Sequence, residues 1–240
     1  MNKELKEEAL EIADDLDAMK LFGASGMIRK SLVAKFEKEG WQVFAQVRKD
    51  SAFSNSVKTI KFDLGNGSAK DLIAEISKLD LIINCAANQE VISAEEITDQ
   101  KALEIFKINT IAPFELIVAA KSIGTKVAIN ISSIEGDVAR HGHEIYGASK
   151  AALDAITRSL ANSLAPMRVN GVRLGLIGGP ELAQRWPGGV ASWKAAVPAG
   201  RYASADEVAE FIYKLSGPEF EYATGAIFDF DGGKSAAPGW

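Results

Sequence analysis

Cysteine and histidine are scarce in this sequence, which has one cysteine, Cys85, and two histidines, His141 and His143. A single cysteine cannot form a disulfide within the chain, and low cysteine content suits a reducing compartment. The usual zinc sites need three or four cysteine, histidine or carboxylate ligands, most often including several of the first two types. We therefore expect no metal site.

Long apolar runs and a basic N-terminus are also missing. No stretch is long enough to cross a bilayer, and the first residues, MNKELKEEALEIADDLD, carry acidic side chains where a signal or transit peptide is basic. We expect a cytoplasmic protein with no membrane partner. The net charge is -5, so no general positive field exists to attract nucleic acid.

The composition is that of a globular protein, with 47% hydrophobic and 25% charged residues in a chain of 240. This length is within reach of one α/β sheet with helices on both faces. No repeat, low-complexity tract or proline-, glycine- and serine-rich linker divides the chain. We expect one domain over residues 18–240, preceded over residues 1–17 by an amphipathic helical extension.

Short apolar segments alternate with longer helical patterns along this domain. The expected strands are 19–22, 41–47, 57–62, 79–85, 126–132, 168–174 and 226–231, and the expected helices are 27–39, 69–78, 98–123, 146–164 and 205–215. The strands are continuously apolar, which indicates burial on both faces. The order predicts an α/β fold, a single-domain Rossmann-type doubly wound parallel sheet with helices on both faces. Residues 178–200, rich in glycine and proline, are expected to form an irregular substrate loop.

A glycine-containing turn follows the first expected strand and opens the first expected helix. It reads Gly23-Ala24-Ser25-Gly26 and continues into Met27 and Ile28. Glycines at such a turn allow close approach to a dinucleotide pyrophosphate, which the helix N–H groups bind. The spacing alone is a weak signal, because such turns also occur without a ligand.

Arg29 stands where the third glycine of a G-x-x-G-x-x-G pattern would fall. That glycine normally permits close packing of helix on strand, so the arginine must be accommodated elsewhere. We hypothesise that Arg29 leans outward and adds a second cation near the adenosine phosphate.

The second expected strand ends in Val47-Arg48-Lys49, at the place where an acidic residue would bind the adenosine ribose of NAD. An arginine there suits the 2'-phosphate of NADP, which it can bind through two parallel hydrogen bonds. Asp50 follows closely and could face the ribose instead. A basic loop that is only solvated, with no ligand, would have the same sequence pattern. The sequence therefore favours NADP(H) without excluding NAD(H).

Tyr146 and Lys150 lie four residues apart at the start of an expected helix, so they share one helix face. Ser132 and Ser133 end the preceding strand. An ammonium group beside a phenol favours the phenolate, which makes Tyr146 a candidate general acid/base. A lone Y-x-x-x-K pair is common, and the combination with the other motifs gives it weight.

Together these motifs resemble those of the classical short-chain dehydrogenase/reductases. The matching segments, in chain order, are Gly23–Gly26, Asn84–Ala87, Asn109 with Pro113, Ile131–Ser133, Tyr146–Lys150, Arg168–Arg173, Thr224-Gly225 and Asp231–Gly233. The resemblance covers nearly everything after residue 18. Ser133 and Tyr146 are separated by 13 positions, the usual gap in that family.

The resemblance implies an oxidoreductase that interconverts a carbonyl and a secondary alcohol by hydride transfer with a nicotinamide cofactor. Tyr146 would be the general acid/base, and Lys150 would lower its pKa and bind the nicotinamide ribose. Ser133 would hold the substrate oxygen, and Asn109 would support a proton relay to Lys150. Further cofactor contacts would come from Asp63, Leu64, Asn84, Ala86 and Ile177.

The resemblance also implies a homodimer or homotetramer, assembled through the helices that begin near Thr98 and Tyr146. Apolar side chains available for that contact, or for the internal core, are Ile111, Phe114, Leu153, Ile156 and Leu160.

Clues to the small-molecule substrate are fewer. Trp186 and Trp193 fall in the expected substrate loop, where they would either cover a substrate or anchor the loop by packing. The segment between Ser133 and Tyr146 is polar and includes Glu135 and His143. It suits a hydroxylated or charged substrate, and it also suits a solvated loop.

Two other functions remain open. Arg29 and Gly179, which replaces a threonine common in the family, favour a non-catalytic sensor or scaffold that binds a nicotinamide dinucleotide. A nucleotide-sugar epimerase or dehydratase shares the glycine and Y-x-x-x-K motifs. Such enzymes need a large C-terminal substrate domain, and only 90 residues follow Lys150.

Overall fold

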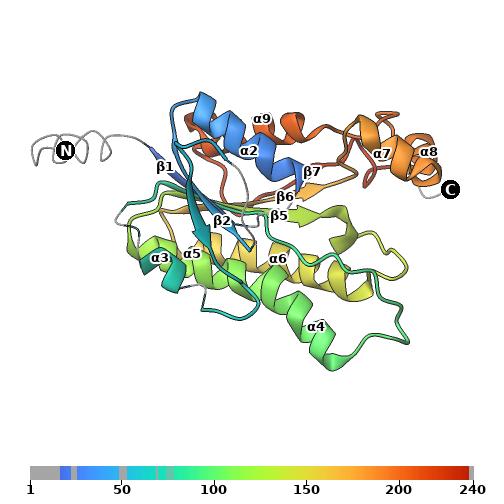
Figure 1. Cartoon of the computed structure of the whole chain (residues 1–240), viewed down its shortest axis with the longest axis horizontal. Helices are drawn as coiled ribbons and strands as arrows, with labels where there is room; N and C mark the ends of the chain where they lie inside the picture. Colours follow the sequence, from blue (N-terminus) through green and yellow to red (C-terminus); the bar gives the residue numbers. More distant parts are fainter. Residues whose placement is uncertain are drawn as a thin grey trace, which may run out of the picture.

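The computed structural model describes residues 17–22, 26–48, 53–68, 70–74, 76 and 78–237. Within these residues, seven strands form one sheet in the order β3-β2-β1-β4-β5-β6-β7, and each adjacent pair is parallel (Figure 1). The strands are β1 (Ala18–Phe22), β2 (Gln42–Val47), β3 (Lys58–Lys61), β4 (Leu81–Asn84), β5 (Val127–Ser133), β6 (Arg168–Leu174) and β7 (Ile227–Phe230). The expected doubly wound parallel sheet is confirmed.

Helices cover both faces of the sheet (Figure 1). One face carries α2 (Met27–Lys38) and α9 (Ala205–Ser216), which pack on each other. The other carries α3 (Asp71–Ala74), α4 (Asp99–Phe106), α5 (Ala112–Ser122) and α6 (Glu144–Ser163). Two short 3-10 turns lie between larger elements: η2 (Ile134–Gly136) lies between β5 and α6, and η3 (Pro218–Phe220) lies between α9 and β7.

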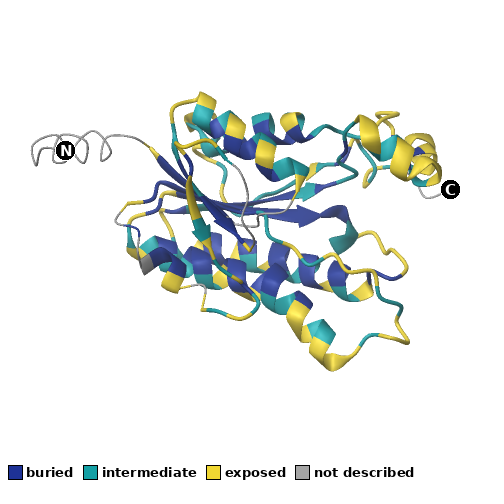
Figure 2. Cartoon of the chain, in the orientation of Figure 1, coloured by how far each residue is buried: buried dark blue, intermediate teal, exposed yellow. Residues whose placement is uncertain are grey.

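The buried strands divide their side chains between two cores because successive residues of a strand point to opposite faces. On β4, Leu81 and Ile83 join the core under α2 and α9, whereas Ile82 joins the core under α5 and α6. Figure 2 shows the central strands buried and each helix exposed on its outer side. Burial on both faces accounts for the continuously apolar strand sequences.

The stretch 178–200 is not the irregular loop that its glycine and proline content suggested. It contains α7 (Pro180–Arg185) and α8 (Pro187–Ala196). Each helix has its proline in the first turn, where the missing N–H costs nothing because first-turn N–H groups have no partner within the helix. Most of this segment is exposed, and it projects beyond the sheet (Figures 1 and 2).

The expected helix over 98–123 is divided in three. Between α4 and α5 the backbone forms a π-helical segment, η1 (Lys107–Ile111), which contains Asn109. Such segments are rare and occur most often at functional sites.

The expected helical extension over residues 1–17 lies outside the described residues except for Asp17. Among the residues that the structure describes, no helix combines the length and the apolar character needed to cross a membrane.

Candidate active site

Two neighbouring cavities open at the carboxyl edge of the sheet. The first, which we name the cleft, has a volume of about 610 Å³ and is lined in part by Ser133, Tyr146 and Lys150. The second, which we name the groove, has a volume of about 670 Å³ and is lined in part by Gly26 and Arg48. Five residues line both cavities, which therefore form one continuous trough: Ile28, Cys85, Ala87, Gln89 and Ile177.

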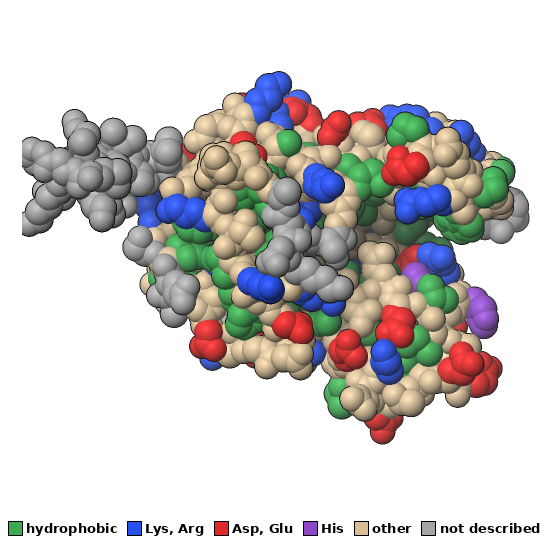
Figure 3. All heavy atoms as spheres, viewed as in Figure 1, with side chains coloured by type: hydrophobic (Ala, Val, Ile, Leu, Met, Phe, Trp, Pro, Cys, Tyr) green, Lys and Arg blue, Asp and Glu red, His purple; other side chains and the backbone are tan. Residues whose placement is uncertain are grey.

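The space-filling view shows this face of the molecule hollowed between the α7–α8 segment and the part that carries α4 and α6 (Figure 3). In open α/β sheets ligands bind in such a crevice, outside the carboxyl ends of the strands.

Three of the expected catalytic residues meet in the cleft. Ser133 ends β5, while Tyr146 and Lys150 lie in the first two turns of α6. Tyr146 and Lys150 are buried, and Lys150 Nζ donates a hydrogen bond to the Ile131 carbonyl at 2.8 Å. The same Nζ lies 5.8 Å from the centre of the Tyr146 ring.

Burial dominates the ionisation of both groups. It lowers the pKa of Lys150 to about 8. It raises the pKa of Tyr146 above its ordinary value, and side-chain hydrogen bonds with Ser133 and Gln89 oppose the rise. The expected lowering of the Tyr146 pKa by Lys150 is therefore not found, because desolvation of the phenolate outweighs an ammonium that is directed at the Ile131 carbonyl. Tyr146 holds its proton and can donate it.

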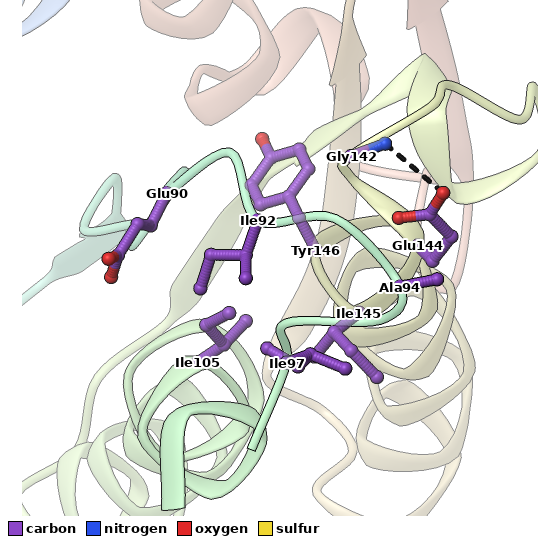
Figure 4. Close-up of a pocket in the computed structure, with 9 residues that line it drawn as sticks. All are labelled: Glu90, Ile92, Ala94, Ile97, Ile105, Gly142, Glu144, Ile145 and Tyr146. Atoms are coloured by element: carbon purple, nitrogen blue, oxygen red, sulfur yellow. Dashed lines mark hydrogen bonds between the residues drawn. The ribbon is translucent and has the colours of Figure 1, made fainter.

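An apolar cavity of about 160 Å³ lies behind the Tyr146 ring. Ile92, Ile97 and Ile105 approach the ring from one side, and the phenolic oxygen points away from them (Figure 4). The loop over this cavity is fixed in part by the Gly142 N–H, which donates to Glu144 Oε1 at 3.1 Å. The apolar wall thus directs the hydroxyl group outward.

Asn109 lies behind the cleft and holds the chain that follows β4. Its Oδ1 accepts a hydrogen bond from the Asn88 N–H at 2.7 Å, and its Nδ2 donates to the Asn88 carbonyl at 3.0 Å. Nδ2 also donates to Ser149 Oγ at 2.9 Å. The π-helical turn thus connects the chain after β4 to α6. The proton relay through Asn109 stays a prediction.

Glu135, Arg140 and His143 form a polar cluster on the cleft wall. The Glu135 carboxylate is 2.5 Å from His143 Nδ1 and accepts a hydrogen bond from Arg140 at 3.0 Å. An ionised carboxylate can only accept, so Nδ1 carries a proton. His143 is buried, its ring meets Tyr146 edge to face, and its Nε2 has no hydrogen-bond partner among the described residues. His141, by contrast, is exposed.

Both tryptophans of the 178–200 segment line the cleft. Trp186 is about half exposed, and the Arg140 guanidinium lies 5.8 Å from its ring centre. Trp193 is more enclosed and donates from Nε1 to the Arg201 carbonyl at 3.2 Å. Trp193 is thus tied to the protein, whereas Trp186 faces the opening.

Most expected cofactor residues line the groove or its junction with the cleft. These are Gly26, Met27, Ile28, Arg48, Leu64, Ala86 and Ile177. Two others are engaged elsewhere: the Asp63 carboxylate accepts from the Gly65 N–H, and Asn84 Nδ2 donates to Asn130 inside the sheet. Gly23, Ser25, Lys49 and Asp50 lie outside the described residues.

Arg29 does not lean outward. Its side chain is only 3% exposed, and the buried residues of α2 are Arg29, Leu32, Val33 and Phe36. This spacing of three, four and seven defines one helix face, so the helical repeat turns Arg29 toward the sheet. Arg29 is one of the residues that line the groove, and its guanidinium lies 4.8 Å from the centre of the Phe53 ring.

Sequence reasoning assigned no separate role to Cys85 or Gln89, which both line the junction of cleft and groove. Burial raises the pKa of the Cys85 thiol to about 11, so the thiol is neutral near pH 7. Their position just after β4, at the carboxyl edge of the sheet, is the signal that could have identified them.

The apolar residues considered for subunit contact separate into two groups. Leu153 and Leu160 are buried within the chain, and Ile156 packs against that core. Ile111 and Phe114 are exposed on η1 and α5.

Comparison with known proteins gives a family model and several relatives. The family model described as enoyl-(acyl carrier protein) reductase matches residues 23–235. L-xylulose reductase from Bos taurus is 27% identical over 227 residues, which cover 88% of this chain and 93% of that protein. Peroxisomal 2,4-dienoyl-CoA reductase from Pongo abelii is 31% identical over 170 residues, or 67% of this chain. That match spans only 58% of the dienoyl-CoA reductase.

Solved structures with the same fold include 4-hydroxyisoleucine dehydrogenase complexed with NADH, with a TM-score of 0.85 at 21% identity. The match covers 92% of this chain and 100% of that one. ElxO with NADP bound has a TM-score of 0.81 at 19% identity, over 92% and 99% of the two chains. At these identities the likeness shows the fold.

The lowered pKa of Lys150 makes the buried ammonium a cost to stability. Between about pH 8 and the ordinary value of 10.5 the unfolded chain binds the proton and the folded chain releases it, so stability rises with pH there. Lys150→Met should therefore raise the free energy of unfolding most below pH 8, by at most about 3 kcal/mol. The gain is reduced because the Ile131 carbonyl loses its hydrogen-bond donor.

Urea unfolding at pH 7 and at pH 10.5 measures this difference, with Lys30→Met, a change at an exposed lysine, as the control. If Lys150→Met raises the free energy of unfolding by the same amount at both pH values, the pKa of Lys150 is not lowered.

Proposed function

The chain belongs to the classical short-chain dehydrogenase/reductase family, and from this premise we propose that it is an NADP(H)-dependent oxidoreductase interconverting a carbonyl and a secondary alcohol. The observation that carries the proposal is the meeting of Ser133, Tyr146 and Lys150 in a cleft that continues into the groove beside α2.

The trough fits a nicotinamide dinucleotide. The backbone at Gly26 is open, since a Cβ placed there would meet nothing within 4 Å. One proton of the Lys150 ammonium goes to the Ile131 carbonyl, and an ammonium has two more for ribose hydroxyls. Gly26, Arg48, Leu64, Ala86, Ile177 and Lys150 would hold the cofactor, which supplies or accepts the hydride.

The protein itself would handle the proton and the substrate oxygen. In reduction, Tyr146 would donate its proton to the carbonyl oxygen that Ser133 holds by a hydrogen bond. Burial raises the pKa of Tyr146, so the phenol retains near pH 7 the proton that it must deliver in reduction. In oxidation the phenolate would have to form, and the same burial would oppose it.

Tyr146→Phe removes one oxygen and keeps the ring against its apolar wall. We expect kcat to fall by about 10²- to 10⁴-fold, the usual contribution of a general acid, while the Kd for NADPH stays unchanged. Steady-state turnover and NADPH fluorescence titration measure the two effects, with Tyr222→Phe as the control at an exposed tyrosine.

Turnover that survives Tyr146→Phe would remove Tyr146 from the reaction. Dinucleotide binding by the natural protein without turnover on any carbonyl or alcohol would instead support the sensor or scaffold.

Preference for NADP(H) rests on Arg48, whose side chain lines the end of the groove. Arg48→Leu should weaken NADPH binding about tenfold or more, because charge-assisted hydrogen bonds to the 2'-phosphate are lost, and should leave NADH binding unchanged. Paired fluorescence titrations at one fixed salt concentration test this. Tighter binding of NADH than of NADPH by the natural protein would reverse the preference and direct attention to Asp50.

For the substrate, we propose a short hydroxylated carbonyl compound. His143 lines the cleft beside Tyr146, and its buried Nε2 has no hydrogen-bond partner among the described residues. With the proton on Nδ1 held by Glu135, Nε2 of a neutral imidazole can accept a hydrogen bond from a substrate hydroxyl. L-xylulose, which the Bos taurus relative reduces by its name, has this chemistry.

His143→Phe keeps a ring against Tyr146 but removes the acceptor. We expect kcat/KM for L-xylulose to fall by about tenfold or more, whereas kcat/KM for 2-pentanone, a ketone of the same length without hydroxyl groups, should not fall. His141→Phe is the control at the exposed histidine. Equal losses on both ketones would show that His143 does not recognise hydroxyl groups.

A second candidate is reduction of a carbon–carbon double bond in an acyl thioester, because the family model and the dienoyl-CoA reductase both carry that description. The Glu135–Arg140–His143 cluster gives the hydroxylated substrate polar partners in the cleft, whereas Ile134, Leu176 and Trp193 on the same cleft would also suit an acyl chain. Turnover of a 2-enoyl thioester in preference to every ketone would favour this candidate.

A further inference from the structure

Arg29 is a buried cation without a matching charge. Its Nε and Nη1 atoms are fully buried and have no hydrogen-bond partner among the described residues. None of the ion pairs found among those residues includes Arg29. Its aromatic contact there is the Phe53 ring, and its electrostatic neighbour is the Cys85 thiol, which is neutral near pH 7. Burial lowers the pKa of Arg29, yet a guanidinium remains protonated in proteins.

An arrangement of this kind is unfavourable unless an anion completes it. Burying an unpaired charge costs several kcal/mol in proteins, and buried cations are therefore almost always paired. Replacement by a glycine, an alanine or a leucine would remove the cost, and the other buried positions of α2 are indeed Leu32, Val33 and Phe36. The missing partner must therefore come from outside the described residues.

The place of Arg29 on α2 indicates what that partner is. Helical side chains lean toward the N-terminus of their helix, so a long side chain in the first turn reaches past the helix end. Here that end opens into the groove, which Arg29 lines together with Gly26 and Arg48. The unpaired N–H groups at the start of α2 add positive potential to the same space, and α2 has no acidic residue in its first turn.

We infer that Arg29 is a phosphate-binding residue of the groove, whose guanidinium pairs with a phosphate group of the bound dinucleotide. The inference rests on the proposed function. It gives Arg29 a role that a glycine at this position could not perform, since glycine offers only backbone. A planar guanidinium whose Nε and Nη1 have no partner among the described residues suits phosphate oxygens, which it can bind through two parallel hydrogen bonds.

NADP(H) presents this chemistry at two places, the pyrophosphate and the 2'-phosphate. NADH contains only the pyrophosphate, and 2'-AMP contains only the 2'-phosphate. Binding of NADPH, NADH and 2'-AMP to one variant therefore identifies which phosphate Arg29 meets.

The test is Arg29→Met, which keeps a long side chain and removes the charge. We expect the Kd for NADPH to rise by about tenfold to a hundredfold and the Tm of the ligand-free protein to rise, because the unpaired cation is gone. Arg29→Lys keeps a charge but lacks the planar guanidinium. Its affinity for NADPH should lie between the affinities of the natural protein and of Arg29→Met. Lys30→Met, at the exposed neighbour on the same turn, controls for net charge and should change neither quantity.

The three ligands separate the outcomes. If Arg29→Met loses affinity for NADPH and 2'-AMP but not for NADH, Arg29 binds the 2'-phosphate. If it loses affinity equally for NADPH and NADH and binds 2'-AMP as before, Arg29 binds the pyrophosphate. Unchanged or tighter NADPH binding by Arg29→Met, with the natural protein binding NADPH, overturns this inference and leaves the proposed function intact. Failure of the natural protein to bind either dinucleotide overturns both.

Discussion

The parallel pairing of β1 with its two neighbours is the constraint on which the site depends. β1 pairs with β2 on one side and with β4 on the other, so the chain leaves β1 in one direction and later returns to its opposite edge. At such a switch point the two following connections diverge, and a crevice opens between them. The groove lies at this crevice, beside the start of α2 and the chain after β4. Continuation of the same sheet to β5 places Ser133 at the neighbouring strand end, where the cleft begins.

Asn130, inside the sheet, is fully paired, whereas Asn84 Oδ1 beside it and nitrogen atoms of two residues along the trough are buried without a partner among the described residues. Asn130 accepts from Asn84 at 2.8 Å and donates to Thr157 at 2.9 Å, so a buried polar strand position is satisfied within the chain. Along the trough, Arg29 and His143 keep buried nitrogen atoms that have no partner in the described part of the chain. Stability alone would favour apolar residues at both positions, so their presence is better explained by a ligand than by folding.

The fold could be predicted because one physical cause controls the whole pattern. Strands buried on both faces must be apolar throughout, and segments such as Leu81–Asn84 show this directly. Local exceptions were harder to predict. The glycines and prolines of residues 178–200 favoured an irregular loop, although a proline in the first turn, such as Pro180 or Pro187, also starts a helix. The π-helical turn around Asn109 has no sequence signal of its own, because it depends on how α4 and the turn itself pack against α6.

At the site, residue types were easier to predict than environments. The spacing of Tyr146 and Lys150 placed them together, but the pKa of Tyr146 depends on burial by residues far apart in the sequence, such as Ile92 and Ile105. Asn84 occupies the expected strand end, yet its side chain turns into the sheet because Asn130 lies opposite it in register. Register and burial are tertiary properties, and neither follows from a motif.

Arg29 shows where the sequence held more information than the motif comparison used. As a departure from a glycine pattern it suggested a side chain that leans outward near the adenosine phosphate, because the missing glycine normally permits close packing of helix on strand. Its distances of three, four and seven from Leu32, Val33 and Phe36 place it on the buried face of α2 whatever its polarity. A charged residue at the first position of an apolar helix face is held next to the helix end, where the backbone N–H groups are also unpaired. Periodicity and charge together therefore point to an anion at that place.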